Sequence, residues 1–414
     1  MIGKKYPQGR PELENEKEMF IGAYWCPSPT DKNYEIAAES GITHMMVNTM
    51  IGHEREDEGY YKVPFGLARK HGVKVVMHAM KDGWQNIKEY RDIFMAQDNF
   101  EGILAEDEPN FSKNDHFAKD YQEYKKDCPD KPYYVNLFPY YASPTAQLGC
   151  DTYEEYVDVH VDKVVKNYDA KHRVLMCDTY PLKNENKLLD KWLWNIELIK
   201  AAGDRVGADV YFFTQDEGFW GGWRQMTTLA ELTIQVYVYL AYGVKGLSHY
   251  PYLTPRGSLP HEKGIVTEQE EKSFIFPMVK IANGLIKKLD GYVFGFDWKG
   301  VMAKIGKNNA DGKNVNFDYC KNMIDGYGVL KNSESEEDMI IGCFENKDGY
   351  NGYMAVNFSE PLVGKPSKIA LEFDGCDKAI VFIHGEPIDV DLIDGKLDFT
   401  LGLGEGVFVV PYKK

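Results

Sequence analysis

Eight short apolar segments, each ending in polar or aromatic residues, recur through roughly the first 250 residues of the chain, the usual extent of a (β/α)₈ barrel. Several of them are separated by stretches with apolar residues at three- and four-residue spacing, which is the period of a helix. This alternation predicts βα units and a parallel sheet. The sequence therefore predicts the α/β class, with a (β/α)₈ TIM barrel. The eight predicted strands are residues 19–25, 42–48, 73–79, 102–108, 132–139, 173–180, 208–215 and 246–252.

Four segments of helical period are expected in the outer ring of this barrel: residues 153–168, 188–202, 229–243 and 268–289. The third of them begins with a capping box, Thr228-Leu-Ala-Glu231. In such a box the hydroxyl of the threonine and the carboxylate of the glutamate each bind a free backbone amide. The same segment ends at Gly243, which suits a left-handed cap. Glu231 is therefore expected to have a structural role.

A different pattern follows Leu289, with short strands of period two separated by turns such as Asp-Gly and Asn-Asn. It predicts a small all-β sandwich, and residues 305–337 are expected to form a long loop or a hairpin. The predicted organisation is an N-terminal extension (1–18), a barrel (19–290) and a C-terminal β-sandwich (291–414). The predicted sandwich strands are residues 291–296, 301–306, 339–346, 352–358, 368–373, 378–383 and 406–412.

Composition narrows the kinds of partner. The chain has 48 Lys and Arg against 64 Asp and Glu, a net charge of −16, which repels phosphate backbones and anionic lipids and argues against nucleic acid as a partner. No apolar run reaches the roughly 18–20 residues that a membrane span needs. The first 18 residues contain no hydrophobic stretch of a signal peptide, so the chain as given is expected to be cytoplasmic, although a trimmed chain would look the same. The sequence makes no prediction of oligomeric state.

No cofactor or metal is expected. The seven cysteines include no CxxC pair, which argues against a disulfide framework and a zinc site. His44, His78 and His249 lie near predicted strands, yet no two of them have ligand spacing on one element. The sequence also lacks the glycine-rich fingerprints of nucleotide-binding loops.

Catalytic groups of a barrel stand at the carboxyl ends of its strands, so the strand endings are the candidate site. The chain has 56 Phe, Trp and Tyr residues, 14% of the total, and the apolar faces of sugars stack on such rings. The loop after the seventh strand adds further aromatic residues between flexible glycines. The predicted substrate-binding residues are Trp25, Asn48, His78, Asp107, Asn136, Tyr180, Gln215, Asp216, Trp220, Trp223, His249 and Tyr250.

The fourth ending, Glu106-Asp107-Glu108-Pro109, provides the clearest indication of chemistry. Three consecutive carboxylates repel one another, and crowding with partial burial raises a carboxyl pKa. A carboxyl group with a raised pKa can act as a general acid, which glycosidic bond cleavage needs together with a second carboxylate. An isolated acidic triplet would more often be a solvated turn, but its place at the fourth barrel strand favours catalysis.

Three stretches resemble clan A glycoside hydrolases, in particular the β-galactosidase-like barrels related to family 42 that carry a C-terminal β-sandwich. These stretches are GILAEDEP on the fourth strand, LMCDTYP on the sixth, and ADVYFFTQ with TTLAELTIQVYVYLAYGVKGLSHYPY from the seventh to the eighth. The resemblance implies a carbohydrate substrate and a glutamate acid/base at the end of strand four, which corresponds to Glu108. Asp107 replaces the asparagine usual in the clan.

The resemblance also implies a glutamate nucleophile at the end of strand seven, where this sequence has Gln215. An amide is a poor nucleophile and cannot accept a proton as a base. Three carboxylates could substitute for it, in the order Glu217, Asp178 and Asp216. Glu217 would point to the same side of the sheet as Gln215 if the strand continued, and Asp178 would suit an inverting mechanism.

The sequence therefore predicts a glycoside hydrolase that cleaves O-glycosidic bonds by carboxylate chemistry. The alternative is a non-catalytic carbohydrate-binding protein derived from such a barrel, in which Gln215 would reflect the loss of the nucleophile. A lyase acting on acidic sugars is a weaker possibility, because Arg224 is the nearest cation to any strand ending. The sandwich is expected to brace the barrel rather than to bind polysaccharide or form a subunit contact.

Overall fold

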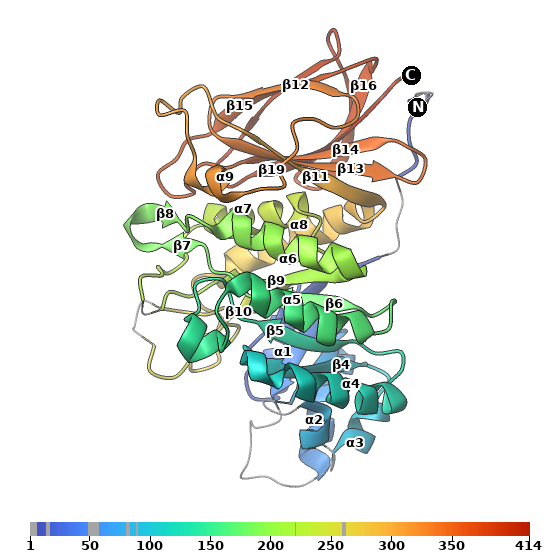
Figure 1. The fold of residues 1–414 in the computed structure, drawn as a ribbon, viewed down its shortest axis with the longest axis vertical. Coiled ribbons are helices and arrows are strands. Elements are labelled where there is room, and N and C mark those ends of the chain that lie inside the picture. Colours follow the sequence, from blue (N-terminus) through green and yellow to red (C-terminus); the bar gives the residue numbers. More distant parts are fainter. Residues whose placement is uncertain are drawn as a thin grey trace.

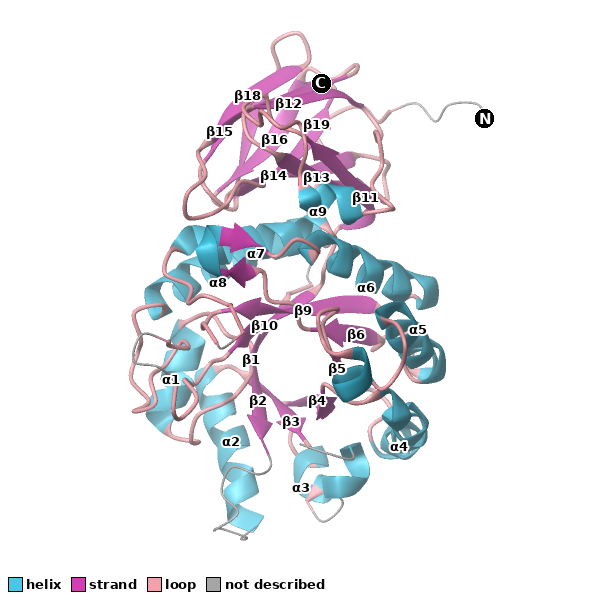
Figure 2. Ribbon diagram, turned by 60° about the vertical axis from the view of Figure 1, so that its left-hand side comes forward, coloured by secondary structure: helices cyan, strands magenta, loops and turns pink. Residues whose placement is uncertain are grey.

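Eight parallel strands close into a barrel, which confirms the predicted α/β barrel fold (Figure 2). The computed structural model describes residues 6–13, 17–48, 58–79, 83–87, 90–219, 221–258 and 262–414. Every predicted barrel strand is present, in the order β1-β10-β9-β6-β5-β4-β3-β2. The strands are β1 (Phe20–Ala23), β2 (His44–Asn48), β3 (Lys74–His78), β4 (Phe100–Asp107), β5 (Tyr133–Leu137), β6 (Val174–Cys177), β9 (Asp209–Gln215) and β10 (Gly246–Tyr250).

Helices surround the barrel, and short turns and one small hairpin decorate its loops (Figure 1). The helices are α1 (Asp31–Glu39), α2 (Glu58–His71), α3 (Arg91–Met95), α4 (Asn114–Asp127), α5 (Tyr153–Lys163), α6 (Trp192–Val206), α7 (Leu229–Ala241) and α8 (Phe276–Val293). The single turns are η1 (Gly83–Ile87), η2 (Phe111–Lys113), η3 (Pro144–Leu148), η4 (Val165–Asn167) and η5 (Asn184–Asn186), and the hairpin pairs β7 (Leu182–Lys183) with β8 (Lys187–Leu188).

The predicted capping box at the start of α7 is confirmed. The Thr228 hydroxyl accepts a hydrogen bond from the amide of Glu231, whose carboxylate accepts one of 2.9 Å from the amide of Thr228. Gly243 follows the helix with φ +69°. The predicted helix 268–289 was wrong at its start, because Glu270 has a left-handed φ of +61° and α8 begins only at Phe276.

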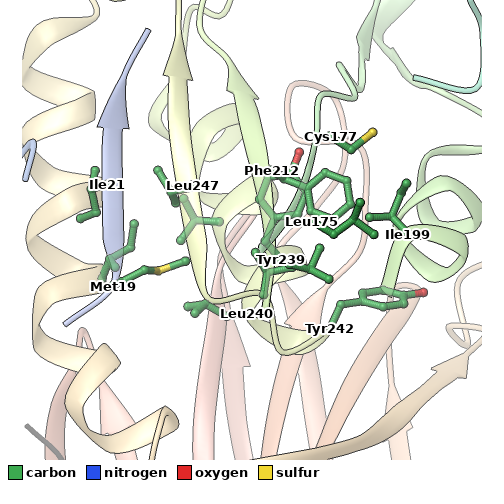
Figure 3. Packing of buried hydrophobic residues seen from close by; sticks show 14 of the residues in the cluster. Met19, Ile21, Leu175, Cys177, Ile199, Phe212, Tyr239, Leu240, Tyr242 and Leu247 are labelled. Atoms are coloured by element: carbon green, nitrogen blue, oxygen red, sulfur yellow. The ribbon is translucent and has the colours of Figure 1, made fainter. Parts of the chain in front are cut away.

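Alternation along the strands divides the barrel core into two layers. Phe213 belongs to an inner cluster with Met46 and Leu104 from other strands, while its neighbour Phe212 faces the outer helices and stacks on Tyr239 at 5.1 Å. Figure 3 shows this outer layer, in which strand residues point toward α6 and α7. The barrel is thus filled with side chains, and open space remains at its ends.

The C-terminal part is a sandwich of two antiparallel sheets, of six and three strands, as predicted in kind. One sheet has the order β11-β13-β14-β19-β16-β17 and the other β12-β15-β18. The elements are β11 (Phe296–Lys304), α9 (Val315–Tyr319), β12 (Leu330–Ser335), β13 (Met339–Asn346), β14 (Asn351–Asn357), β15 (Ser367–Phe373), β16 (Lys378–Ile383), β17 (Glu386–Asp391), β18 (Lys396–Leu401) and β19 (Gly406–Tyr412).

Some sandwich strands differ from the prediction. The predicted strand 291–296 was wrong, because α8 continues to Val293 and buries that side chain on the helical period. The region 305–337 holds α9 and β12. The strands β17 and β18 were not predicted. The side chains of β17 are mostly exposed, and its pairing with β16 depends on the backbone.

The sandwich packs on α7 and α8, on the side of the barrel shown uppermost in Figure 1. The approach is close: a Cβ atom at Gly342 of β13 would overlap the backbone of Ala241 in α7. Among the described residues, no helix combines the length and apolar character needed to cross a bilayer. All seven cysteines are free thiols.

Candidate active site

A cavity of about 360 Å³ opens at the carboxyl ends of the barrel strands. Strand endings and the loops after β5, β6 and β9 line it, and three of its side chains are carboxylic acids. A larger cavity, about 1170 Å³, borders Met19 and Thr43, which precede β1 and β2 at the opposite end of the barrel. The smaller cavity therefore has the position where barrel enzymes place their chemistry. Its lining is Tyr24, Asp107, Glu108, Asn136, Phe138, Pro139, Tyr141, Ala142, Gln147, Asp178, Tyr180, Phe213, Phe219, Trp223 and Tyr250.

Asp107 ends β4 and is held by two hydrogen-bond donors from other strands. The Tyr24 hydroxyl donates to Oδ2 at 2.7 Å, and Nδ2 of Asn136 donates to Oδ1 at 2.8 Å. Asn136 lies opposite Asp107 in the register of β4 and β5. Both oxygens of the carboxylate are therefore fixed in orientation, and each can still accept a further hydrogen bond.

Glu108 turns the chain out of β4. Its backbone is left-handed, with φ +52°, and its amide donates to the carbonyl oxygen of Asn136 at 2.8 Å. Pro109 follows, and a residue before proline is disfavoured in the right-handed helical region. A non-glycine residue with positive φ carries strain that is found most often at functional sites. This turn brings the carboxyl group of Glu108 into the cavity beside that of Asp107.

Asp178, directly after β6, completes a cluster of three carboxyl groups. Burial raises the pKa of Glu108 well above 4.5, and the negative charges of Asp178 and Asp107 raise it further. Burial also raises the pKa of Asp178, as does the charge of Asp107. The pKa of Glu108 is raised by the charges of both neighbouring carboxylates, whereas of these two only the charge of Asp107 raises that of Asp178, so Glu108 keeps its proton to the higher pH. Asp178 is therefore the group of the pair that ionises first, and its Oδ1 has no hydrogen-bond partner among the described residues.

Aromatic rings form the walls around these acids. Tyr180 and Tyr250 lie with ring centroids 5.3 Å apart, and Phe219 stacks on Trp223 at 5.2 Å with 17° between planes. Tyr141 closes the wall against Trp223 at 4.9 Å. Such faces suit the apolar side of a sugar ring.

Seven of the predicted site residues therefore line one cavity: Asp107, Glu108, Asn136, Asp178, Tyr180, Trp223 and Tyr250. Sequence reasoning did not select Tyr141, and from the first strand ending, Tyr24-Trp25, it selected only Trp25 as a substrate-binding residue. Tyr24 directly precedes the predicted Trp25, whose side chain is 46% exposed and is not among the lining residues. The two-residue alternation of a strand decides which of these neighbours faces inward. The aromatic pair Tyr140-Tyr141 after the fifth strand was an available signal.

Gln215 is buried, and its side chain forms hydrogen bonds with backbone groups instead of lining the cavity. Its Oε1 accepts from the amide of Leu182 at 2.7 Å, and its Nε2 donates to the carbonyl oxygens of Leu182 and Arg224 at 3.2 and 3.0 Å. An amide provides the donor and acceptor that these contacts need. The residue at the predicted nucleophile position thus fastens two loops together.

Asp216 and His249 form a fully buried pair behind the cavity. Nδ1 of His249 lies 2.8 Å from Oδ2 of Asp216, and Nε2 lies 3.0 Å from Oδ1 of Asn283 on α8. Burial alone would lower the pKa of His249, but the charge of Asp216 and the hydrogen bonds raise it overall. Neither side chain lines the cavity, so in place of the predicted substrate contacts the two residues form an internal hydrogen-bonded pair.

Glu217 lies outside the cavity lining, although it was the first choice as second carboxylate. Its Oε1 accepts from the Ser258 hydroxyl at 2.7 Å. Burial raises the pKa of Glu217 to about 7. The strand β9 ends at Gln215, and the chain then turns, so the alternation that would aim Glu217 inward does not continue.

The remaining predicted residues have other positions. His78 is buried and its ring lies 5.6 Å from that of Tyr24, and Asn48 ends β2; neither lines the cavity. Trp220 lies outside the described residues. Within the described part of the chain, no group of three or more His, Cys, Asp and Glu side chains is placed to hold a metal ion.

Comparison with solved structures shows similar folds. A β-galactosidase from Bacillus circulans sp. alkalophilus has a TM-score of 0.62 and 8% identity over 96% of this chain and 100% of that chain. A catalytic mutant of a GH42 β-galactosidase from G. stearothermophilus has a TM-score of 0.60 and 9% identity over 97% and 99%. A β-galactosidase from Marinomonas ef1 (TM-score 0.46, 8% identity) aligns over 65% of this chain, which spans about 60% of that enzyme.

At such identities the likeness shows the fold alone. Comparison with protein-family models and with curated protein sequences finds no match.

Proposed function

We propose that this protein is a glycoside hydrolase, with Glu108 as general acid/base and Asp178 as its partner carboxylate. The observation that carries the proposal is the Glu108–Asp178 pair, which faces an aromatic cavity at the carboxyl ends of the barrel strands. Solved barrels of similar fold include β-galactosidases, which supports this choice among reaction classes. The alternative of a non-catalytic sugar-binding barrel rested on Gln215, but Asp178 provides the carboxylate that Gln215 lacks.

The chemistry follows from the two protonation states. Glu108 donates its proton to the glycosidic oxygen as the bond to the anomeric carbon breaks, and the leaving group departs as an alcohol. The Asp178 carboxylate attacks that carbon from the opposite face and forms a glycosyl ester. Glu108, now ionised, removes a proton from water as the water attacks the same carbon, which releases the sugar and regenerates both groups.

The closeness of the pair favours this retaining route. An inverting enzyme keeps its two carboxyl groups about 6.5–9.5 Å apart, because a water must fit between one of them and the sugar. Glu108 and Asp178 each act directly on the pKa of the other and line the same cavity, which favours a shorter separation. Asp178 is therefore assigned as nucleophile instead of as a base for water.

The cavity suits a neutral sugar. Its lining contains carboxylic acids, phenols, an indole and the amides of Asn136 and Gln147, and the described lining contains no Lys or Arg that would bind a sugar carboxylate. Asp107, fixed by Tyr24 and Asn136, is placed to accept a hydrogen bond from a sugar hydroxyl. A carbohydrate without acidic groups is the expected substrate.

The test compares Glu108→Gln and Asp178→Asn on a panel of 4-nitrophenyl and 2,4-dinitrophenyl glycosides. Loss of a general acid is expected to lower kcat by about 10²–10⁴ with 4-nitrophenyl substrates, while sugar affinity is retained. Glu108→Gln should keep the first, bond-breaking step with the 2,4-dinitrophenyl substrate, because that leaving group needs no proton. Asp178→Asn should lose the bond-breaking step with the 4-nitrophenyl and the 2,4-dinitrophenyl substrates alike.

Glu101→Gln is the matched control, because Glu101 lies at the opposite end of the same strand and pairs with Lys131 at 3.4 Å. An unchanged rate in Glu108→Gln would remove its assigned role. Sugar binding by the native protein with no turnover of any substrate would favour the non-catalytic alternative.

A further inference from the structure

A buried ion network connects the wall of the cavity to the sandwich domain. Nη2 of Arg224 lies 3.2 Å from Oε1 of Glu231, at the start of α7, and 2.6 Å from Oε1 of Glu360. Glu360 belongs to the connection between β14 and β15 in the sandwich. The exposed side-chain fractions are 11% for Arg224, 0% for Glu231 and 16% for Glu360, so all three charges are largely withdrawn from water.

Arg224 directly follows Trp223, and the two side chains point to opposite sides of an extended segment. Trp223 faces the cavity, and its backbone pairs with that of Lys183 on one side and of Phe219 on the other. The amide of Arg224 donates to the carbonyl oxygen of Leu182 at 3.0 Å. Fixing the guanidinium therefore fixes the direction in which the neighbouring indole points.

Stability alone does not account for such a network. Withdrawing three charges from water costs free energy that their attraction only partly offsets, and apolar replacements of such groups are often no less stable. What a buried ion network does provide is one defined geometry, because any displacement leaves a charge unpaired. Here the segment held in that geometry carries the ring that closes the cavity.

We infer that Arg224 and Glu360 are positioning residues: through the Glu360 carboxylate, the sandwich domain holds the stacked Phe219–Trp223 wall in place around the cavity. All described lining residues belong to the barrel, so the sandwich acts on the site without contacting its contents. Glu231 holds the other side of the guanidinium and also caps α7. The inference concerns how the wall is held, and only its kinetic test rests on the proposed function.

The first experiment measures acrylamide quenching of Trp223 fluorescence, taken as the difference between each protein and its Trp223→Phe version. Glu360→Gln keeps the size of the side chain and removes its charge, so we expect the quenching constant of Trp223 to rise about twofold or more as the wall loosens. Arg224→Lys should give a similar rise, because the shorter lysine side chain does not bring its ammonium to the position from which Nη2 reaches both carboxylates. Urea unfolding verifies that each variant is folded.

Glu386→Gln is the matched control. Glu386 also joins the sandwich to the barrel, through Lys288 of α8 at 2.7 Å, but far from the cavity in the fold. If the ion network only docked the sandwich on the barrel, Glu360→Gln and Glu386→Gln would change the quenching constant of Trp223 by the same amount. An unchanged Trp223 quenching constant in folded Glu360→Gln and Arg224→Lys would overturn the inference.

The second experiment compares the steady-state kinetics of the native enzyme and of Glu360→Gln on the best 4-nitrophenyl glycoside. Glu360→Gln should raise KM about two- to tenfold, the effect of one misplaced aromatic contact, and should leave the pH profile of kcat in place. A fall in kcat with native KM would contradict a positioning role. If no glycoside is hydrolysed, the proposed function fails, and the quenching experiment still decides the inference.

Discussion

The hydroxyl of Tyr24, at the end of the first barrel strand, donates a 2.7 Å hydrogen bond to Oδ2 of Asp107, at the end of the fourth. This contact spans the mouth of the barrel and fixes the orientation of a carboxylate that lines the cavity. Asp107 in turn raises the pKa of both Glu108 and Asp178. Tyr24 thus fixes the orientation of the carboxylate whose charge acts on the other two acids.

Tyr24→Phe is therefore expected to lower kcat/KM about 10- to 100-fold, the usual loss for a hydrogen bond to a charged group. Steady-state kinetics on the best glycoside substrate provides the measurement. Tyr211→Phe is the control, because Tyr211 lies in the barrel interior on β9 and is outside the cavity lining. Equal effects of the two substitutions would show that the phenol of Tyr24 has no specific role.

The unusual protonation of Glu108 predicts a dependence of stability on pH. Its pKa is raised in the folded protein, so at pH above 4.5 the folded state binds a proton that the unfolded state releases. This difference in proton binding lowers the free energy of unfolding. The loss is absent below pH 4.5, grows as the pH rises, and is complete above the raised pKa of Glu108 in the folded state.

Glu108→Gln removes this titration. We expect the variant to unfold with a free energy about 1–3 kcal/mol higher than that of the native protein at pH 7, and with little difference at pH 4.5. Urea unfolding at the two pH values measures the effect, with Glu101→Gln as the control at the other end of β4. A variant less stable than the native protein at pH 7 would argue against a protonated Glu108.

The main features of the fold could be predicted from the sequence because they depend on local patterns. Eight apolar segments at regular spacing specify the barrel, and the Thr228–Glu231 box specifies the start of α7. The exposed strand β17 escaped detection, since backbone pairing leaves no hydrophobic pattern. The helical end at 291–293 was mistaken for a strand because a short apolar run suits both.

The acidic cluster was only half predictable. Glu108 follows from the acidic triplet at a strand ending, but its partner depends on which side chains converge across the barrel. Asp178 follows β6 directly and enters the cavity, whereas Glu217 lies beyond the turn after β9 and binds Ser258. Asp178 is the first residue after its strand and Glu217 the second, so one position decides which enters the cavity, and strand ends are the least predictable feature of a sequence.

The buried Asp216–His249 pair gives a prediction about stability. Asp216→Asn removes the carboxylate that pairs with His249, and removing one partner of a buried pair in this way costs about 3–5 kcal/mol. Urea unfolding should show this loss. Thr214→Val removes the 3.3 Å hydrogen bond to Oδ1 of Asp216 and the 3.0 Å contact with Nδ1 of His249 but keeps the carboxylate, so it should cost much less. Wild-type stability in Asp216→Asn, with weakened sugar binding, would return Asp216 to the substrate site.

Gln215 allows a direct test of where the second carboxylate lies. If strand seven carried the nucleophile position, Gln215→Glu would restore a complete pair and raise activity. The structure predicts the opposite, because a carboxylate cannot donate to the carbonyl oxygens of Leu182 and Arg224 as Nε2 does. Placing a carboxylate among these carbonyl oxygens should cost about 2–4 kcal/mol of unfolding free energy and lower kcat, since the loop with Trp223 would shift.

Thermal unfolding and turnover of the best glycoside measure both effects of Gln215→Glu. The matched control is Gln122→Glu, the same chemical change on the exposed face of α4, which should leave stability within about 0.5 kcal/mol of the native value. The two sites differ only in burial and in the contacts of the amide, so the difference between them isolates the role of the Gln215 donor. A Gln215→Glu protein that is stable and more active would move the nucleophile from strand six to strand seven, and Asp178 would lose its assignment.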